Sequence, residues 1–286
     1  SVTGVQTCAL PISKGCYFYV LDEQKDGNIR LGIVLKKKIL LTEWIGTDFQ
    51  EIKAPLDQAL KKRAGQPDAV LYLSSLLQAG FDQTKDDAFY NQEQTLLVNA
   101  LKKEPFNKDM YKQLIKLYQS KGEYDKAYEV YRDNADRYVY DMSWYETLIV
   151  QSYELGYQKL GEQDVAQKEQ YFQTGLAAYQ HVVDGVEHLK TLPKGQMQGN
   201  PFEITQPMVL NAGKMQFMMN EPAKAAEIFK VGIKDDLSDS TNREIARWYL
   251  AALQKTGATD QAVYDRLMQV DPSEKASIEQ LASLTF

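Results

Sequence analysis

The sequence predicts an all-α protein built as a superhelix of antiparallel helix pairs, with a short β-hairpin near its start. Two observations support this fold class. From about residue 55 onward, apolar residues recur every three or four positions, which is the spacing of one face of a helix. Glycine or proline interrupts these helical runs at short intervals. Short connections place successive helices antiparallel, and a series of such pairs stacks into a superhelix.

Composition and charge are those of a folded globular chain. Of the 286 residues, 44% are hydrophobic and 25% are charged. The net charge is −6, so nucleic acid is not an expected partner. Residues 1–63 carry +3 and the remainder −9, and the basic start reflects either an ordinary solvated surface or proximity to an anionic membrane. No apolar run reaches the roughly 18 residues that a membrane-spanning helix needs.

The first residues read as foreign to the protein. Residues 2–12 resemble the translation of a short-read sequencing adapter and match it at all eleven positions. We therefore expect residues 1–12 to be an artefact without packed contacts, and the natural coding sequence to begin upstream. Cys8 then carries no biological role and Cys16 stands alone, which argues against a disulfide framework.

Residues 13–54 are expected to form the hairpin and a linker. Residues 17–21 and 29–35 are rich in aromatic and β-branched side chains, and Asp26-Gly27 between them is a turn signal. Residues 36–53 are ambiguous. Pro55 then marks the start of a helical repeat domain, residues 55–286.

Eleven helices are expected in this domain. They cover residues 68–79, 87–103, 108–120, 124–137, 143–155, 164–192, 207–219, 222–234, 242–255, 260–270 and 273–284. Glycines at positions 80, 122, 156 and 257 are expected to end the helices before them, because glycine readily adopts the left-handed backbone of a helix end.

The helix pair that begins at Lys108 shows a repeat pattern. Gly122 ends its first helix, Ala127 is the small residue at the crossing of the second helix, and Tyr131 is a large residue one turn later. This pattern resembles the tetratricopeptide repeat (TPR), whose period is about 34 residues. Looser versions recur around Gly156, around Gly213 and before Gly257, so the resemblance implies a TPR-like superhelix.

The repeat phase predicts which side chains line the concave face of this superhelix. Lys112, Lys116, Glu146 and Tyr153 occupy first-helix positions that would share one groove. We expect the groove to bind a protein or peptide segment, with the lysines receiving a carboxylate and Tyr153 stacking on an apolar side chain. The plainer alternative is two solvated lysines and a tyrosine that fills space between helices.

No pattern in the sequence predicts catalysis, a cofactor or a metal. P-loop, GxGxxG, GxSxG and HExxH motifs do not occur. His181 and His188 lie seven positions apart, but a metal site would need two further ligands, so packed or solvated histidines are expected. The connection at residues 192–206 is either a plain insertion or a functional loop. The fragment itself is therefore expected not to be an enzyme.

Four segments carry a wider resemblance: residues 104–131, 144–156, 188–205 and 236–253. On these segments, the chain resembles the C-terminal repeat region of O-antigen ligase/polymerase-family membrane proteins of Gram-positive bacteria. In that family a membrane domain that precedes the repeats carries the glycan-transfer chemistry. The resemblance implies a non-catalytic interaction scaffold, soluble as a fragment and membrane-associated through a parent protein of cell-surface polysaccharide assembly. A free-standing TPR adaptor or chaperone-like protein and a glycan-binding module remain alternatives.

Overall fold

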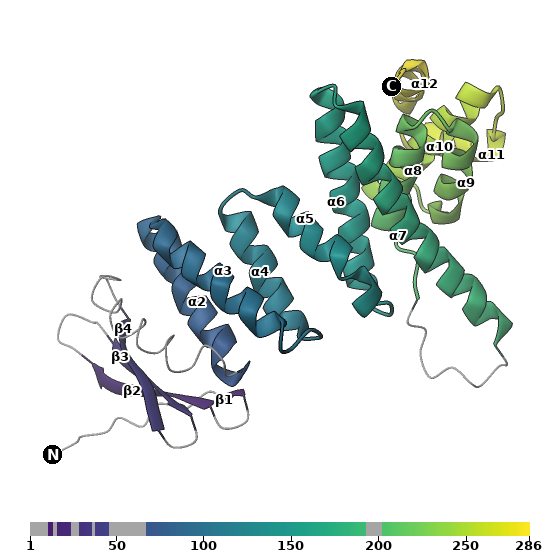
Figure 1. Ribbon diagram of the computed structural model, residues 1–286. Coiled ribbons are helices and arrows are strands. Elements are labelled where there is room, and N and C mark those ends of the chain that lie inside the picture. Colours follow the sequence, from purple (N-terminus) through teal and green to yellow (C-terminus); the bar gives the residue numbers. More distant parts are fainter. Residues whose placement is uncertain (1–10, 14–15, 24–28, 36–37, 46–66, 193–201) are drawn as a thin grey trace. The chain divides into compact units, whose positions relative to one another are not determined.

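The computed structural model describes residues 11–13, 16–23, 29–35, 38–45, 67–192 and 202–286, and side chains from residue 69 onward within these ranges. Contacts divide the chain into two compact units, Ser1–Val130 and Tyr131–Phe286. Figure 1 shows the order of the elements along the chain. The predicted boundary between residues 54 and 55 lies outside the described residues.

The N-terminal strands form an antiparallel sheet that is wider than the expected hairpin. The strands are β1 (Pro11–Ser13), β2 (Cys16–Glu23), β3 (Ile29–Leu35) and β4 (Lys38–Ile45), and they pair in this order. The two runs predicted to pair lie in β2 and β3, where Tyr17 is opposite Val34. Asp26 and Gly27 lie outside the described residues. Strand β4 falls in the stretch that the sequence left ambiguous.

Strand β1 includes the last two residues of the adapter-like stretch. Pro11 is paired with Tyr17 of β2, although residues 1–12 were expected to make no packed contacts. An edge strand presents unpaired N–H and C=O groups to any extended segment beside it, which is enough to explain this pairing. Residues 1–10 lie outside the described residues, so the adapter origin stays a prediction.

Two of the four described helices of the first unit begin at side-chain caps. The four helices are α2 (Pro67–Thr84), α3 (Asp87–Leu101), α4 (Lys108–Ser120) and α5 (Tyr124–Asp133), the last of which crosses the unit boundary. The capped helices are α3 and α4. Asn107 caps α4 by accepting a hydrogen bond from the backbone N–H of Met110. The prediction that α2 ends at Gly80 is wrong. The helix continues because Leu77 and Phe81, on either side of Gly80, belong to one buried face.

Seven helices and a short 3-10 turn make up the described part of the second unit. These are η1 (Ala135–Arg137), α6 (Met142–Gly161), α7 (Val165–Thr191), α8 (Gln206–Met218), α9 (Pro222–Gly232), α10 (Ser240–Thr256), α11 (Gln261–Val270) and α12 (Glu274–Ser283). The eleven helices expected from the sequence are all present in the described residues. The all-helical character predicted for this part of the chain is thereby confirmed.

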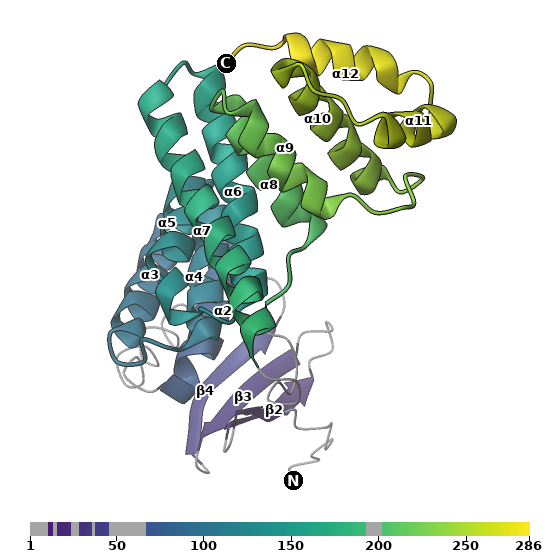
Figure 2. The same ribbon diagram turned by 90° about the vertical axis from the view of Figure 1, so that its right-hand side faces the viewer.

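Glycine at position 156 does not end a helix, as the sequence predicted, but lets two helices approach. Helix α6 runs through it to Gly161. A Cβ atom on Gly156 would lie 2.4 Å from Cε1 of Phe172 in α7, closer than real Cβ contacts. Gly213 in α8 meets Phe229 of α9 in the same way, at 2.3 Å. Figure 2 shows both pairs, α6 with α7 and α8 with α9, running side by side.

Each successive helix pair turns through one residue with left-handed backbone. These residues are Lys85, Gly122, Gln163, Asn220 and Gly257, with φ between 56° and 77°. Gly122 and Gly257 occupy the turns that the sequence assigned to them. The described helices therefore follow one another as five helix–turn–helix pairs closed by α12, an arrangement of the helical-repeat kind. The two helices pack against each other in α2–α3, α6–α7, α8–α9 and α10–α11, whereas α4 and α5 make few contacts.

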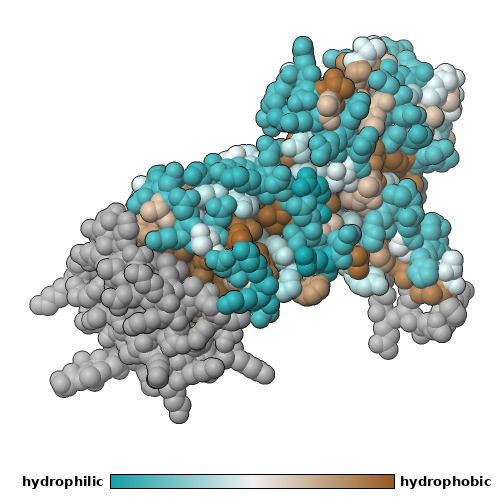
Figure 3. All heavy atoms as spheres, viewed as in Figure 1, coloured by the Kyte–Doolittle hydropathy of each residue, from teal (hydrophilic) through white to brown (hydrophobic). Residues whose placement is uncertain are grey.

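The surface of the helical part is mostly polar. On the face drawn in Figure 3, hydrophilic residues predominate and apolar residues appear as separate patches. Within the described residues, every helix is too short or too polar to cross a bilayer.

Candidate functional site

The four residues predicted to share a groove lie in two different units. Lys112 and Lys116 are exposed on α4 of the first unit. Glu146 and Tyr153 are half-buried on α6 of the second unit. Each pair is described within its own unit, and a groove that unites all four remains a prediction.

Tyr153 belongs to a cluster on three helices of the second unit. Lys214 of α8 places its Nζ 2.6 Å from Oε1 of Glu244 in α10. The same Nζ lies 5.3 Å from the ring centroid of Tyr153 and 5.5 Å from that of Trp248. A cation between two aromatic faces and a carboxylate is stabilised by all three. We call the cluster of Tyr153, Lys214, Glu244 and Trp248 the α6–α8–α10 face. Trp248 is buried beneath it, and Glu244 is its more exposed charged member.

A second tyrosine extends this face toward solvent. The rings of Tyr153 and Tyr157 are stacked, with centroids 5.8 Å apart and planes inclined by 26°. Tyr157 is 52% exposed, so one of the two rings is available to a ligand. Burial, together with smaller electrostatic effects of Tyr157 and Glu244, raises the pKa of Tyr153 to about 12. The Tyr153 phenol therefore stays neutral at physiological pH and keeps its proton as a hydrogen-bond donor.

Glu146 has a structural contact that the sequence did not indicate. Its Oε2 accepts a hydrogen bond of 2.5 Å from Oγ1 of Thr205. Thr205 is the N-cap of α8 and accepts from the backbone N–H of Met208. Glu146 thus ties the beginning of α8 to α6 and fixes the position of these helices. Its contact with a partner stays a prediction.

Three members of the face were missed in the sequence: Lys214, Glu244 and Trp248. A signal for two of them existed, because Lys214 and Trp248 each stand nine residues after the N-caps of their helices, Thr205 and Asp239. Equal distances from the N-cap place side chains on equivalent faces of successive first helices. Lys214 and Trp248 are also 34 residues apart, which equals the repeat period, so only their register with Tyr153 was hidden, by the longer α6–α7 pair.

The first unit buries a carboxylate among neutral donors. Glu93 of α3 is fully buried, and its Oε1 accepts from Ser74 Oγ at 2.6 Å and from Gln113 Nε2 at 3.3 Å. Burial raises the pKa of Glu93 to about 7. Asp82 adds to the rise, whereas the two hydrogen bonds and the charge of Lys116 oppose it. Glu93 Oε2 has no hydrogen-bond partner among the described residues. This carboxyl is therefore partly protonated at neutral pH.

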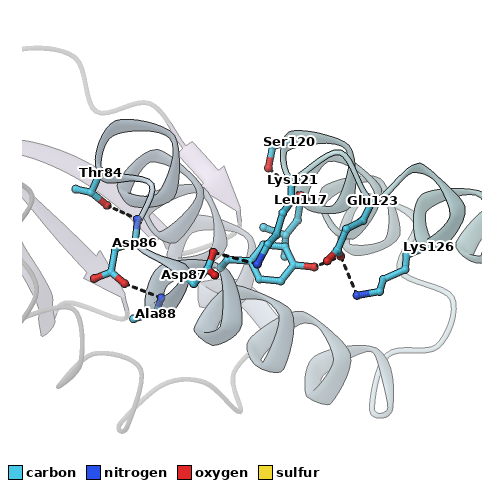
Figure 4. A network of polar contacts seen from close by, with 10 residues as sticks. Thr84, Asp86, Asp87, Ala88, Leu117, Ser120, Lys121, Glu123 and Lys126 are labelled. Carbon is cyan, nitrogen blue, oxygen red and sulfur yellow. Dashed lines mark hydrogen bonds and ion pairs between the residues drawn. The ribbon is translucent and has the colours of Figure 1, made fainter.

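A polar network joins the turns of the first unit (Figure 4). Lys121 places its Nζ 3.0 Å from Oδ1 of Asp87 and 4.2 Å from the ring centroid of Tyr90. The Tyr90 hydroxyl donates to Glu123, which also accepts from Lys126 Nζ at 2.9 Å. Burial and Glu123 hold the pKa of Tyr90 well above its usual value. These contacts link α3 to the turn between α4 and α5 and stabilise the packing of the first unit.

The two histidines lie in the part of the chain whose side chains are described, and neither belongs to a metal-binding group there. His181 Nε2 lies 3.1 Å from the carbonyl oxygen of Val139, and its ring stacks on Tyr145 with centroids 4.4 Å apart. His188 is exposed. Within the ranges whose side chains are described, no group of three His, Cys, Asp or Glu is suited to hold a metal ion. The side chains of Cys8 and Cys16 fall outside those ranges.

A small pocket of about 190 Å³ lies between α10, α11 and α12. It is lined by Leu250, Gln254, Ala258, Thr259, Asp260, Gln261, Tyr264 and Ile278. Asp260 is engaged, because it caps α11 and accepts a 3.0 Å hydrogen bond from the Tyr249 hydroxyl. The walls thus offer space for an apolar side chain and no reactive group.

Comparison with known proteins identified no relative of this chain in two searches. No protein-family model matches the sequence, and no curated protein matches it either.

Proposed function

We propose that this chain is a non-catalytic, TPR-type interaction scaffold that binds an extended peptide segment of a protein partner on the α6–α8–α10 face. The observation that supports this most directly is the position of Lys214 between Tyr153, Trp248 and Glu244. A charged group held in place by its neighbours keeps the adjacent aromatic rings in fixed positions. The ring that offers contact area is that of Tyr157, which stacks on Tyr153 and is 52% exposed. A rigid aromatic ring gives contact area with little loss of side-chain entropy, which is typical of interaction surfaces.

The chemistry of the face favours a peptide with mixed character. The exposed ring of Tyr157 offers a surface for an apolar side chain, while Glu244 keeps a side chain that is 36% exposed and accepts hydrogen bonds. Lys112 and Lys116 would add a cationic site on the first unit. Binding through exposed charges is screened by salt, so the affinity should be modest and should fall with ionic strength.

In the wider proposal, the chain is the repeat region of a larger membrane protein that takes part in cell-surface polysaccharide assembly. This rests on the four sequence segments that resemble O-antigen ligase/polymerase-family proteins. A free-standing adaptor is the competing proposal. The upstream genomic sequence separates them, because a run of hydrophobic spans would support the first and a start codon at this point the second.

The stacked pair Tyr153–Tyr157 also favours a second candidate, a glycan-binding module. Sugar rings stack on exposed aromatic faces, and Tyr157 provides one. Titration with cell-surface polysaccharide, followed by tyrosine fluorescence, tests this candidate. A response that is lost in Tyr157→Ala would favour it over the peptide.

The peptide proposal is tested by selection from a random peptide display library, followed by fluorescence anisotropy of the selected peptides. We expect Tyr157→Ala and Lys214→Met each to weaken binding by about tenfold, the size of one good interface contact. Tyr124→Ala is the matched control, because this tyrosine is also exposed, at 59%, but lies on α5. Selected peptides that bind the unsubstituted chain and these three variants with equal affinity would contradict the proposal. Lys112→Ala/Lys116→Ala tests the first unit separately.

A further inference from the structure

Residues 284–286, which follow α12, lie against the ends of two other helices of the second unit. Asn220 Nδ2, at the turn after α8, donates a 2.9 Å hydrogen bond to the main-chain oxygen of Phe286. Lys255 Nζ, in the last turn of α10, donates a 2.6 Å hydrogen bond to the main-chain oxygen of Leu284. In Figure 2 the segment after α12 runs toward the end of the α8–α9 hairpin.

An aromatic contact accompanies these hydrogen bonds. The Phe286 ring meets Phe217 of α8 edge-on, with centroids 6.0 Å apart and planes inclined by 76°. Phe217 is fully buried and also meets Trp248 edge-on at 5.3 Å. Because Trp248 belongs to the α6–α8–α10 face, Phe286 extends an aromatic row that begins on that face. We call residues 284–286 the tail. The tail thus lies at the end of the proposed binding surface.

Both donors stand on ordered backbone, one in the turn after α8 and one in the last turn of α10. Asn220 has a left-handed backbone, with φ of 61°, and asparagine tolerates this conformation better than most residues. Its N–H bonds to the carbonyl of Phe217, which fixes the turn from which its side chain projects. Lys255 Nζ also lies 5.6 Å from the Phe217 ring centroid. Two donors and one aromatic edge therefore converge on one short segment.

These contacts suit many peptides besides the tail. Both hydrogen bonds go to main-chain oxygens, which every peptide carries, and one aromatic side chain supplies the selectivity. Leu284 is 37% exposed and Thr285 is exposed, so two of the three side chains of this segment make little contact with the rest of the protein. A segment held by so few contacts is favoured because it is tethered, which gives it a high effective concentration at the site.

We propose that Asn220, Lys255 and Phe217 form a binding site for an extended peptide with an aromatic side chain, and that residues 284–286 occupy this site in the free protein. A partner peptide with an aromatic residue displaces the tail and continues along the α6–α8–α10 face. The proposal rests on the proposed peptide-binding function and adds to it the class of ligand and a competition that sets the affinity.

The test uses a labelled, amidated peptide of residues 279–286, EQLASLTF, and measures its binding by fluorescence anisotropy. The amide keeps the carbonyl oxygen that Asn220 contacts. We expect a variant that lacks residues 284–286 to bind this probe at least about tenfold more tightly than the full chain, because the competing tail is gone. Phe286→Ala in the full chain should also increase the affinity for the probe. Thr285→Ala, at an exposed position, is the matched control and should behave as the full chain.

Two further substitutions in the shortened variant assign the donors. Asn220→Gly removes the side-chain donor but allows the left-handed backbone, and Lys255→Met removes the ammonium but keeps a long apolar side chain. Each should weaken binding of the probe severalfold. Circular dichroism and hydrogen exchange establish that the variants are folded. If the shortened variant does not fold, Phe286→Ala carries the test.

Equal affinity of the probe for the full chain and the shortened variant would overturn the proposal, and so would absence of binding to a folded shortened variant. The outcome is distinguishable from failure of the general function. Library peptides that depend on Tyr157 while the probe does not bind would leave the α6–α8–α10 face standing and remove the tail site. If the probe binds but the affinity of the library peptides does not depend on Tyr157, the tail site would stand and the α6–α8–α10 face would be removed as a binding surface.

Discussion

Each of the two units buries a glutamate, and their surroundings differ. Glu93 in the first unit accepts hydrogen bonds from the neutral donors Ser74 and Gln113. Glu274, which begins α12 in the second unit and is 3% exposed, is paired with Arg247 through two hydrogen bonds and lies 3.7 Å from Arg243. A guanidinium compensates for the loss of water around a carboxylate, whereas neutral donors compensate only in part. Glu274 is therefore an ion-paired anchor of α12 in the second unit, whereas in the first unit burial raises the pKa of Glu93 to about 7.

The largest expected effect is at the ionic anchor. Glu274→Gln removes the partner of two arginines and leaves an uncharged amide in a buried position. We expect a loss of about 3–4 kcal/mol in the free energy of unfolding of the second unit, at the lower end for a buried pair because Arg247 is 29% exposed. Urea denaturation followed by circular dichroism measures it. A loss below about 1 kcal/mol would show that the pair behaves as a surface salt bridge.

The second prediction concerns Glu93, whose replacement should increase the free energy of unfolding. Because the folded-state pKa of Glu93, about 7, lies above the ordinary value of 4.5, the native state keeps its proton after the unfolded chain has lost it. Stability therefore falls as the pH rises from about 4.5 to about 7, and levels off above. Glu93→Gln should raise the free energy of unfolding by about 2–3 kcal/mol at pH 8 and change it little at pH 4.5.

Asp82 and Lys116 also face this carboxyl and shift the window in opposite directions. Measurement of unfolding at several pH values, for the natural chain and for Glu93→Gln, separates this group from others. Parallel pH profiles for the two proteins would show that Glu93 is ionised in the native state.

The smallest effect belongs to the exposed pair of Figure 4. Lys121→Met removes the ion pair with Asp87, whose side chain is 65% exposed, and the contact with the Tyr90 ring. Solvent screening limits the expected loss to about 0.5 kcal/mol, and added salt should reduce it further. A loss as large as that of Glu274→Gln would mean that charge pairs matter equally in both units.

Much of the helical architecture was predictable, because glycine and proline interrupt clear helical periodicity. Gly122 and Gly257 do adopt the left-handed backbone that their positions predicted. Gly80 and Gly156 do not, and both lie inside helices. For Gly156 the reason is a contact with Phe172, a residue on the next helix, and a glycine that admits a neighbour looks the same in the sequence as one that ends a helix.

The candidate site was predictable only in part. Tyr153 followed from the repeat phase, because that phase depends on one helix alone. Lys214 and Trp248 are one repeat period apart, but their place beside Tyr153 depends on the register across the α6–α7 pair, which helix α7 makes longer than the repeat predicts. The burial of Glu93 was not predictable, because this residue lies in the polar stretch 91–95. The side chains that contact it, Ser74 and Gln113, come from other helices that are distant in the sequence.

The left-handed turn residues have a consequence for thermostabilisation. Lys85 and Gln163 hold this backbone conformation with a side chain present, which costs of order 1 kcal/mol or more each. Gly122 and Gly257 perform the same turn without that cost. Lys85→Gly and Gln163→Gly are therefore expected to raise the melting temperature, one substitution in each unit. At Asn220 the side chain is needed for its hydrogen bond to Phe286, so a gain in heat resistance there would be made at the expense of the tail site.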